Sequence, residues 1–154
     1  MAEPKRIQVR DRFYDVLSSI RAEDGYHYTP DLVAKNFNEF QMGAGKIKLT
    51  ALPDEGGEIV NHSGAVDETF YMLVVGHAEN QDDPVLVAER VLNDVRVAVD
   101  VDSRIESSTA LGGICLQVVM DESANILHEM AMEGITRFTQ RFRCMITAAD
   151  FLGL

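Results

Sequence analysis

One segment, ETFYMLVVGHAENQDDPVLVAERVLNDVRVAVD (residues 68–100), constrains the fold more strongly than any other part of the chain. Its first part, over 68–79, is apolar at both odd and even positions, which is typical of a strand covered on both faces. From Pro84 onward, apolar residues recur at the i, i+3, i+4 and i+7 spacing of an amphipathic helix. The segment therefore predicts a central strand followed by a long helix, with the strand between helices and a neighbouring layer or subunit.

The polar residues between this strand and this helix admit two interpretations. Asn80, Gln81, Asp82 and Asp83 stand in a row before Pro84. An Asp at the N-cap followed by Pro at the first helical position is a favoured helix start. A metal site would need further ligands converging from elsewhere, and the sequence offers no evident candidates. We therefore interpret Asp83 and Pro84 as a helix N-cap and predict no metal site.

The remaining segments are assigned from their apolar period and their turn residues. Residues 7–21 have a helical period, and Gly25 is expected as the C′ residue that ends the helix. Alternation predicts strands over 46–53 and 132–147, and strand composition returns over 112–122. We expect loops or connections elsewhere: 26–45 with a short edge strand near 32–36, 53–66 as a long loop or an extended hairpin, 99–113, and 123–131.

The order of these elements predicts the fold class. Runs of antiparallel strands with helices gathered on one face give an α+β domain. We expect residues 1–154 to form one domain, with a two-layer, mostly antiparallel β-sheet and two main helices packed on one face. The length is that of an ordinary single domain.

The charge of the chain limits its partners. There are 25 acidic and 14 basic residues, and the formal net charge is −11. Because duplex binding rests mainly on Lys and Arg that neutralise phosphates, the charge argues against a protein that grips DNA, but not against one past which DNA slides. No apolar run approaches the ~18 residues that span a bilayer, and the N-terminal segment lacks the apolar region of a secretory signal. We expect no membrane association and a place of assembly in the cytoplasm.

Three arginines share one face of the last predicted strand: Arg137, Arg141 and Arg143. One interpretation is a solvated face. The other is a subunit interface that meets an acidic patch on a neighbouring copy, because Arg is the preferred cation for such contacts. Phosphate binding along this stripe is disfavoured by the net charge.

Residue types that carry chemistry are present but form no recognised motif. The sequence GAGKI at 43–47 lacks the glycine spacing and the hydroxyl residue of a phosphate-binding loop. The histidines form no metal-binding or catalytic pair in sequence; they are His27, His62, His77 and His128. We interpret His27 and His77 as packing or hydrogen-bonding residues, and Cys115 and Cys144 as reduced, buried thiols. We predict no catalytic residue, no cofactor and no metal ligand.

The order of these segments resembles that of a known family. A helix ending in SSIRAEDGYHYTP precedes KIKLTALPDEGGE, then ETFYMLVVGHAENQDDPVLVAERVLNDVRVAV, then STALGGICLQVV and a last long strand. In this order and spacing, the chain resembles the tail terminator (tail completion, or head–tail joining) proteins of long-tailed bacteriophages. The likeness extends over nearly the whole chain and matches least at 26–45 and 53–66.

The resemblance implies a function without a reaction. Proteins of this family have an α+β fold and form a six-fold ring, which implies that this chain forms a homo-oligomer, a hexamer, in the virion. The ring lies at the head-proximal end of the tail tube, ends tube polymerisation and joins the tail to the neck. The implied partners are further copies of the chain, the tail tube protein and a neck or connector protein, while DNA passes through the lumen without specific binding.

Three alternatives remain open at this point. Another neck or baseplate ring protein would share these features. A small cytoplasmic enzyme would use His77 or His27 together with carboxylates such as Asp82 and Asp83. A regulatory or adaptor module would bind a peptide along a free edge of the sheet.

Overall fold

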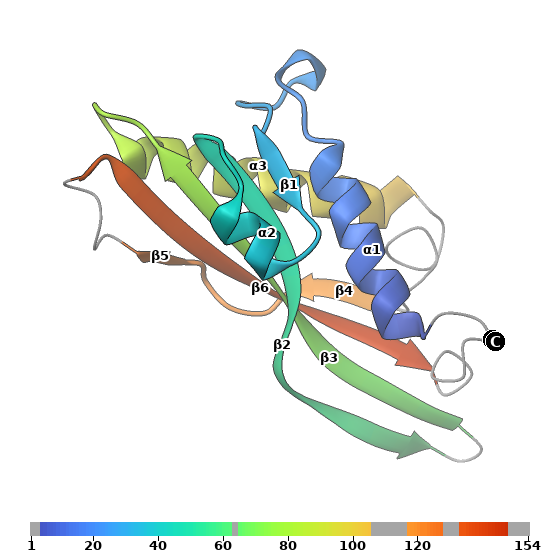
Figure 1. Ribbon diagram of the computed structural model, residues 1–154. Coiled ribbons are helices and arrows are strands. Elements are labelled where there is room, and N and C mark those ends of the chain that lie inside the picture. The colour runs from blue at the N-terminus through green and yellow to red at the C-terminus, as the bar shows by residue number, and fades with distance from the viewer. Residues whose placement is uncertain (1–3, 63–64, 106–116, 128–132, 148–154) are drawn as a thin grey trace.

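The computed structural model describes residues 4–62, 65–105, 117–127 and 133–147. Its elements in chain order are α1 (Lys5–Ser18), the 3-10 turn η1 (Ala22–Asp24), β1 (Leu32–Ala34), α2 (Phe37–Met42), β2 (Ile47–His62), β3 (Ala65–Glu79), α3 (Pro84–Ile105), β4 (Gln117–Met120), β5 (Asn125–Leu127) and β6 (Ile135–Thr147). The helices and the sheet form an α+β fold, as predicted (Figure 1).

β3 lies in the middle of a six-stranded sheet. The strand order is β1-β2-β3-β6-β4, and β5 pairs with another stretch of β6. β1 and β2 run parallel, and the other pairs are antiparallel. The mostly antiparallel sheet and the central position of residues 68–79 are therefore confirmed.

α1 and α3 cover one face of this sheet. Their apolar stripes meet the sheet in one buried cluster, which includes Val9, Phe13 and Leu17 of α1, Ala88, Val91 and Val95 of α3, and Phe70, Met72, Phe138 and Phe142 of β3 and β6. Each such side chain contributes about 1.5–3 kcal/mol when it is buried. Gly76 of β3 is required by this packing, because a Cβ there would lie 2.1 Å from the ring of Phe138.

The opposite face of the sheet, which we call the open face, is covered only in part. α2 lies in front of the sheet in Figure 1, with α3 behind it, and it buries Phe40 against Ala34 and Val75. Farther along the same face, Leu52 and Leu73 are only half-buried. A strand with apolar residues on both faces is normally packed against other groups on both of them. The open face is therefore the incompletely packed side of the described fold.

β2 and β3 form the extended hairpin that was one of the two interpretations of residues 53–66. Their register shifts between Asp54 and Glu58. At the shift, Gly57 has φ +115°, and a Cβ on it would lie 2.3 Å from the carbonyl oxygen of Thr69. Beyond the shift, residues 58–62 pair with residues 65–69, and we call these two segments the hairpin arm. In Figure 1 the arm forms the lower right end of the sheet, and β5 lies at the left.

Two helix ends differ from the sequence predictions. α1 ends at Ser18, and Gly25 (φ 97°) instead ends the 3-10 turn η1. α3 continues to Ile105, so the first part of the connector expected over 99–113 is helical. The added turns are held against α1 because the guanidinium of Arg12 donates to the carboxylate of Asp102.

The segment expected to be mostly loop over 26–45 contains both a strand and a helix. β1 is the short edge strand predicted there, but α2 was not predicted. The side chain of Asn36 accepts from the backbone N–H of Glu39 at 2.8 Å, and the Glu39 carboxylate accepts from the N–H of Lys35 at 3.2 Å. This N-x-x-E pattern is close to a capping box, a start signal that the sequence carries. β5 likewise occupies part of 123–131, where a connection was expected.

Candidate functional site on the open face of the sheet

The strand register fixes which side chains lie together on the open face. Arg137 of β6 is opposite His77 of β3, which is opposite Lys48 of β2. Arg141 is opposite Leu73, which is opposite Leu52. Arg143 lies opposite Tyr71, and Val119 of β4 flanks it on the other side. The three arginines predicted as an interface do share one face, but their surroundings differ.

Arg141 is surrounded by partners within its own protomer. Its guanidinium lies 3.6 Å from the centroid of the Tyr71 ring. Its Nε lies 3.5 Å from an oxygen of Asp121 and 3.7 Å from one of Asp54, and its Nη1 lies 3.7 Å from Glu122. Its Nη2 donates to the carbonyl oxygen of Glu55 at 3.3 Å. Arg141 therefore holds the base of the hairpin arm to β6 and to the turn after β4.

Arg137 belongs to a basic row under α2. Its guanidinium lies 5.9 Å from the centroid of the Phe40 ring, and the Nζ of Lys48 lies 5.3 Å from the same centroid. Lys48 is only 6% exposed and donates from Nζ to the carbonyl oxygen of Gly43 at 3.1 Å. Cations over an aromatic face are stabilised by the ring quadrupole, so Phe40 holds this row together.

His77 lies in the middle of the basic row and is 5% exposed. Burial lowers the pKa of His77 below its ordinary value, the charges of Lys48 and Arg137 act in the same direction, and the hydrogen bond to Glu79 opposes them. The Nε of Arg137 donates to Nδ1 of His77 at 3.4 Å, so Nε2 carries the proton and faces Glu79 at 3.4 Å. This neutral imidazole serves as a bridge between two charged neighbours.

Arg143 is the exposed arginine of the three. It makes no ion pair with another residue in the described part of the chain. It lies beside the ring of Tyr71 and the side chain of Val119 on the open face. Of the predicted interface residues, Arg143 is therefore the one whose charge is most available to another molecule.

An apolar depression lies beside the basic row, and we call it the open-face hollow. Its volume is about 290 Å³, and its walls come from α2, β2, β3, β5 and β6: Phe37, Leu52, Leu73, Val75, Leu127, Arg137 and Thr139. Phe37 and Leu127 on its rim are each 41% exposed. Contiguous exposed apolar surface of this kind marks an interaction site more often than isolated exposed residues do. Sequence reasoning identified the open apolar strand but not the hollow, which needs α2 and β5.

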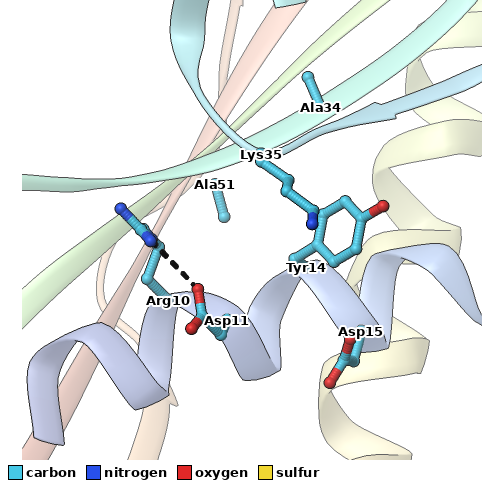
Figure 2. Close-up of a pocket in the computed structure, with 7 residues that line it drawn as sticks. All are labelled: Arg10, Asp11, Tyr14, Asp15, Ala34, Lys35 and Ala51. Atoms are coloured by element: carbon cyan, nitrogen blue, oxygen red, sulfur yellow. Dashed lines mark hydrogen bonds and ion pairs between the residues drawn. The ribbon is translucent and has the colours of Figure 1, made fainter. Parts of the chain in front are cut away.

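A second, more polar cavity lies between α1 and the β1–β2 edge of the sheet (Figure 2). Its volume is about 420 Å³, and it is lined by Arg10, Asp11, Tyr14, Asp15, Ala34, Lys35 and Ala51. The charged residues there pair with their neighbours: Arg10 bonds to Asp11 at 3.2 Å, and the Nζ of Lys35 lies 5.2 Å from the Tyr14 ring centroid. Among these lining residues, no hydrogen bond joins a nucleophile to a base, which is the arrangement that covalent catalysis uses.

The histidines and carboxylates named for an enzyme are not brought together. His27 bonds through Nδ1 to Asp94 at 2.9 Å, while His77 contacts Glu79 and Arg137. Asp83 accepts from the N–H of Leu86 at 3.0 Å, which is the bond that an N-cap makes. The side chain of Asn80 accepts from the N–H groups of Asp82 and Asp83. The acidic cluster therefore shapes the turn into α3.

Asp94 is a structural residue that sequence reasoning did not single out. It is 3% exposed on α3, and its carboxylate accepts from the backbone N–H groups of His27 and Tyr28 at 3.0–3.1 Å. It therefore fixes the loop after η1 to the helix layer. A buried acid in the apolar stripe of a helix was the available signal, because buried carboxylates need such partners.

The described ranges contain neither a cluster of metal ligands nor a membrane-spanning helix. Among these residues, no group of three His, Cys, Asp or Glu side chains could hold a metal ion. Cys144 is buried, while Cys115 and His128 lie outside the described residues. No helix within the described ranges is both long and apolar enough to cross a membrane.

No protein family model matches the chain, and no curated protein matches it significantly. The geometry of the open face and the order of the sequence segments therefore carry the functional argument.

Proposed function

We propose that this protein is a structural subunit of a phage tail, which forms a six-membered ring at the head-proximal end of the tail tube. The ring ends polymerisation of the tail tube protein and joins the tube to the neck or connector protein. Support for the tail assignment comes from the segment order that resembles tail terminator proteins. Support for ring formation comes from the open face.

The open face with its apolar hollow is the observation that carries this proposal. The sheet has apolar residues on both sides of β3. Among the described elements, α1 and α3 cover one side and α2 covers only part of the other. Protein interfaces have an apolar centre within a polar rim in which Arg is enriched. Here the hollow supplies the apolar centre, and Arg137 supplies a basic rim. A second copy of the chain is the simplest cover for such a surface in an assembly of identical subunits.

The charge of the chain suits a ring through which DNA passes. With a net charge of −11, each subunit repels a phosphate backbone, so that DNA in the lumen is not retained by counterion release. Arg137 and Arg141 of the open face are held close to Phe40, Tyr71 and acidic side chains. Their charges are therefore occupied within the protomer and less available to phosphates.

Native mass spectrometry of the full chain is the first test of this proposal. We expect a closed ring of identical subunits at micromolar concentration. A species that stays monomeric up to 100 μM would overturn the ring assignment.

A tube assembly assay separates a terminator from other ring proteins. The tail tube protein of the same phage is polymerised with and without this chain, and tube lengths are measured by negative-stain electron microscopy. We expect shorter tubes with one capped end. A ring that leaves tube length unchanged would assign the chain to another neck or baseplate position.

A further inference from the structure

We infer that the hairpin arm of one copy seats Ile59 in the open-face hollow of the neighbouring copy. The inference rests on the proposed function, because it requires a second copy of the chain. It adds the two surfaces that meet and the direction in which the subunits follow one another around the ring.

The arm presents an apolar residue that its own protomer does not cover. Ile59 is 63% exposed and Val60 is 37% exposed, although both lie in a paired strand. Exposed β-branched residues on a projecting hairpin are an aggregation hazard unless another surface covers them. A surface that covers Ile59 would therefore remove this hazard and gain its burial energy.

The apolar walls of the hollow and the charge at its rim suit this arm. Residues 54–68 contain five acidic residues and no Lys or Arg. Two of these acids, Asp54 and Glu68, already contact Arg141 and Arg6 within the protomer, whereas Glu55 and Glu58 are exposed. The hollow has apolar walls and Arg137 at its rim. An aliphatic residue flanked by acids therefore matches an apolar depression flanked by a cation.

The hairpin arm of one protomer cannot reach the hollow of the same protomer. Ile59 of β2 lies in register with Ile146 of β6, with β3 between them. Leu127 of the hollow pairs directly with Arg137 of β6. These two positions of β6 are nine residues apart, which is about 30 Å along a strand. The arm and the hollow are thus two different patches at opposite ends of one sheet. A contact between two different patches is heterologous, and it generates a ring when the rotation closes.

The direction of the arm is fixed before any neighbour arrives. Gly57 allows the close approach to Thr69 that bends β2, and Arg141 holds the bend through Tyr71 and the carbonyl oxygen of Glu55. A fixed arm loses little conformational entropy on docking, and such preorganisation raises affinity.

Substitution of the two surfaces tests the inference, with assembly followed by native mass spectrometry and sedimentation. We expect Ile59→Asp and Leu127→Asp each to raise the concentration at which half of the chain is assembled by about tenfold or more, because an aliphatic contact is replaced by a buried charge. Leu86→Asp is the matched control. Leu86 is 43% exposed, like Leu127 at 41%, but it lies in the first turn of α3, where an acid suits the helix dipole. The control should assemble like the wild type.

A cross-link tests the same contact even if an aspartate variant fails to fold. In Ile59→Cys/Leu127→Cys, mild oxidation should give a ladder of covalent multimers up to the closed ring. The about 30 Å within one protomer exceeds the 4.4–6.8 Å between Cα atoms that a disulfide spans, so the bond must join two copies. Each single-cysteine variant, which retains the native thiols, should give no ladder.

The outcomes separate this inference from the proposed function. A monomeric wild type overturns the ring itself. A wild-type ring that survives both aspartate variants and gives no cross-link overturns the docking of the arm and leaves the ring standing. A ring that survives Leu127→Asp but no longer shortens tail tubes would show that the tube protein occupies the hollow, which also overturns the inference.

Discussion

Arg141 lies where the hairpin arm leaves the sheet, with its guanidinium on the Tyr71 ring and near the carboxylates of Asp54, Asp121 and Glu122. A neighbouring copy would have to compete with these partners for its charge. Arg141 therefore has a structural role inside the protomer, and its interface role stays a prediction, whereas Arg143 has no such partners among the described residues.

Arg141→Ala is expected to lower the free energy of unfolding by about 1–2 kcal/mol, because it removes a cation–π contact and leaves clustered carboxylates uncompensated. Arg143→Ala is the matched control on the same strand and face, and its effect should stay within about 0.5 kcal/mol. Urea denaturation under conditions in which the chain is dissociated measures both. Equal effects for the two variants would contradict the structural role of Arg141.

His77 makes stability depend on pH through its lowered pKa. In the unfolded chain this histidine takes up a proton as the pH falls below its ordinary pKa of 6.5, whereas the folded chain resists protonation. The unfolded state then binds more protons, so the free energy of unfolding falls with decreasing pH in the window just below 6.5. Above that window, the contribution of His77 is constant and fully present.

The measurement is the free energy of unfolding of wild type and His77→Gln between pH 5 and 8. Glutamine keeps the capacity to accept from Arg137 without titrating. We expect the wild type to lose stability more steeply than the variant between pH 6.5 and 5. Parallel curves in that window would show that His77 has the same proton affinity in both states.

Elements with a long, regular pattern were predicted from sequence, whereas of the short elements β1 and β4 were predicted but α2 and β5 were not. β3 and α3 follow from the apolar alternation and the helical stripe, and the face that each strand buries follows from period two, as Phe138 and Phe142 show. α2 has six residues, too few for a helical period to be visible, and its start signal at Asn36 lies among aromatic and turn residues. The hollow could not be predicted because it forms only where α2 and β5 meet the sheet from distant parts of the chain.

The two glycines at the base of the hairpin arm allow a prediction about how this element is built. Gly56 and Gly57 both have positive φ, at +95° and +115°, but their surroundings differ. A Cβ on Gly57 would lie 2.3 Å from a backbone oxygen, whereas one on Gly56 would lie 3.3 Å from Nη2 of Arg141 and 3.4 Å from the ring of Tyr71, which side-chain shifts of a few tenths of an ångström relieve. Gly57→Ala should therefore cost about 2–4 kcal/mol, and Gly56→Ala only the about 1 kcal/mol of a left-handed alanine.

Thermal unfolding of the two alanine variants measures this difference, and the assembly assay adds a second readout. If the bend directs the arm, Gly57→Ala should also weaken ring formation more than Gly56→Ala does. Equal loss of stability for the two variants would mean that the backbone at Gly57 relaxes away from Thr69 without cost.

In the whole molecule, the fold and the net charge both favour association through one defined surface. Among the described elements, α1 and α3 close one face of the sheet around the core of the protomer, and the other face stays partly uncovered. The net charge of −11 opposes association of like copies at long range, while the apolar hollow and its basic rim favour it at short range. We expect such a protein to associate through one defined contact and not to bind polyanions through its general surface.

The contrast between the negative net charge and the local basic rim predicts how the chain behaves toward DNA. Proteins that bind duplex DNA nonspecifically do so with dissociation constants of roughly 10⁻⁴–10⁻⁶ M at physiological salt, through Lys and Arg that release counterions. Here Arg141 and Arg137 are held by partners in the protomer, and only Arg143 of the stripe is exposed. We therefore expect no change in the fluorescence anisotropy of a labelled 30-base-pair duplex up to about 10 μM protein at 150 mM NaCl. Saturable binding that weakens with salt and is lost in Arg143→Glu would instead assign the arginine stripe to phosphate contacts, and DNA would then be held in the lumen of the ring.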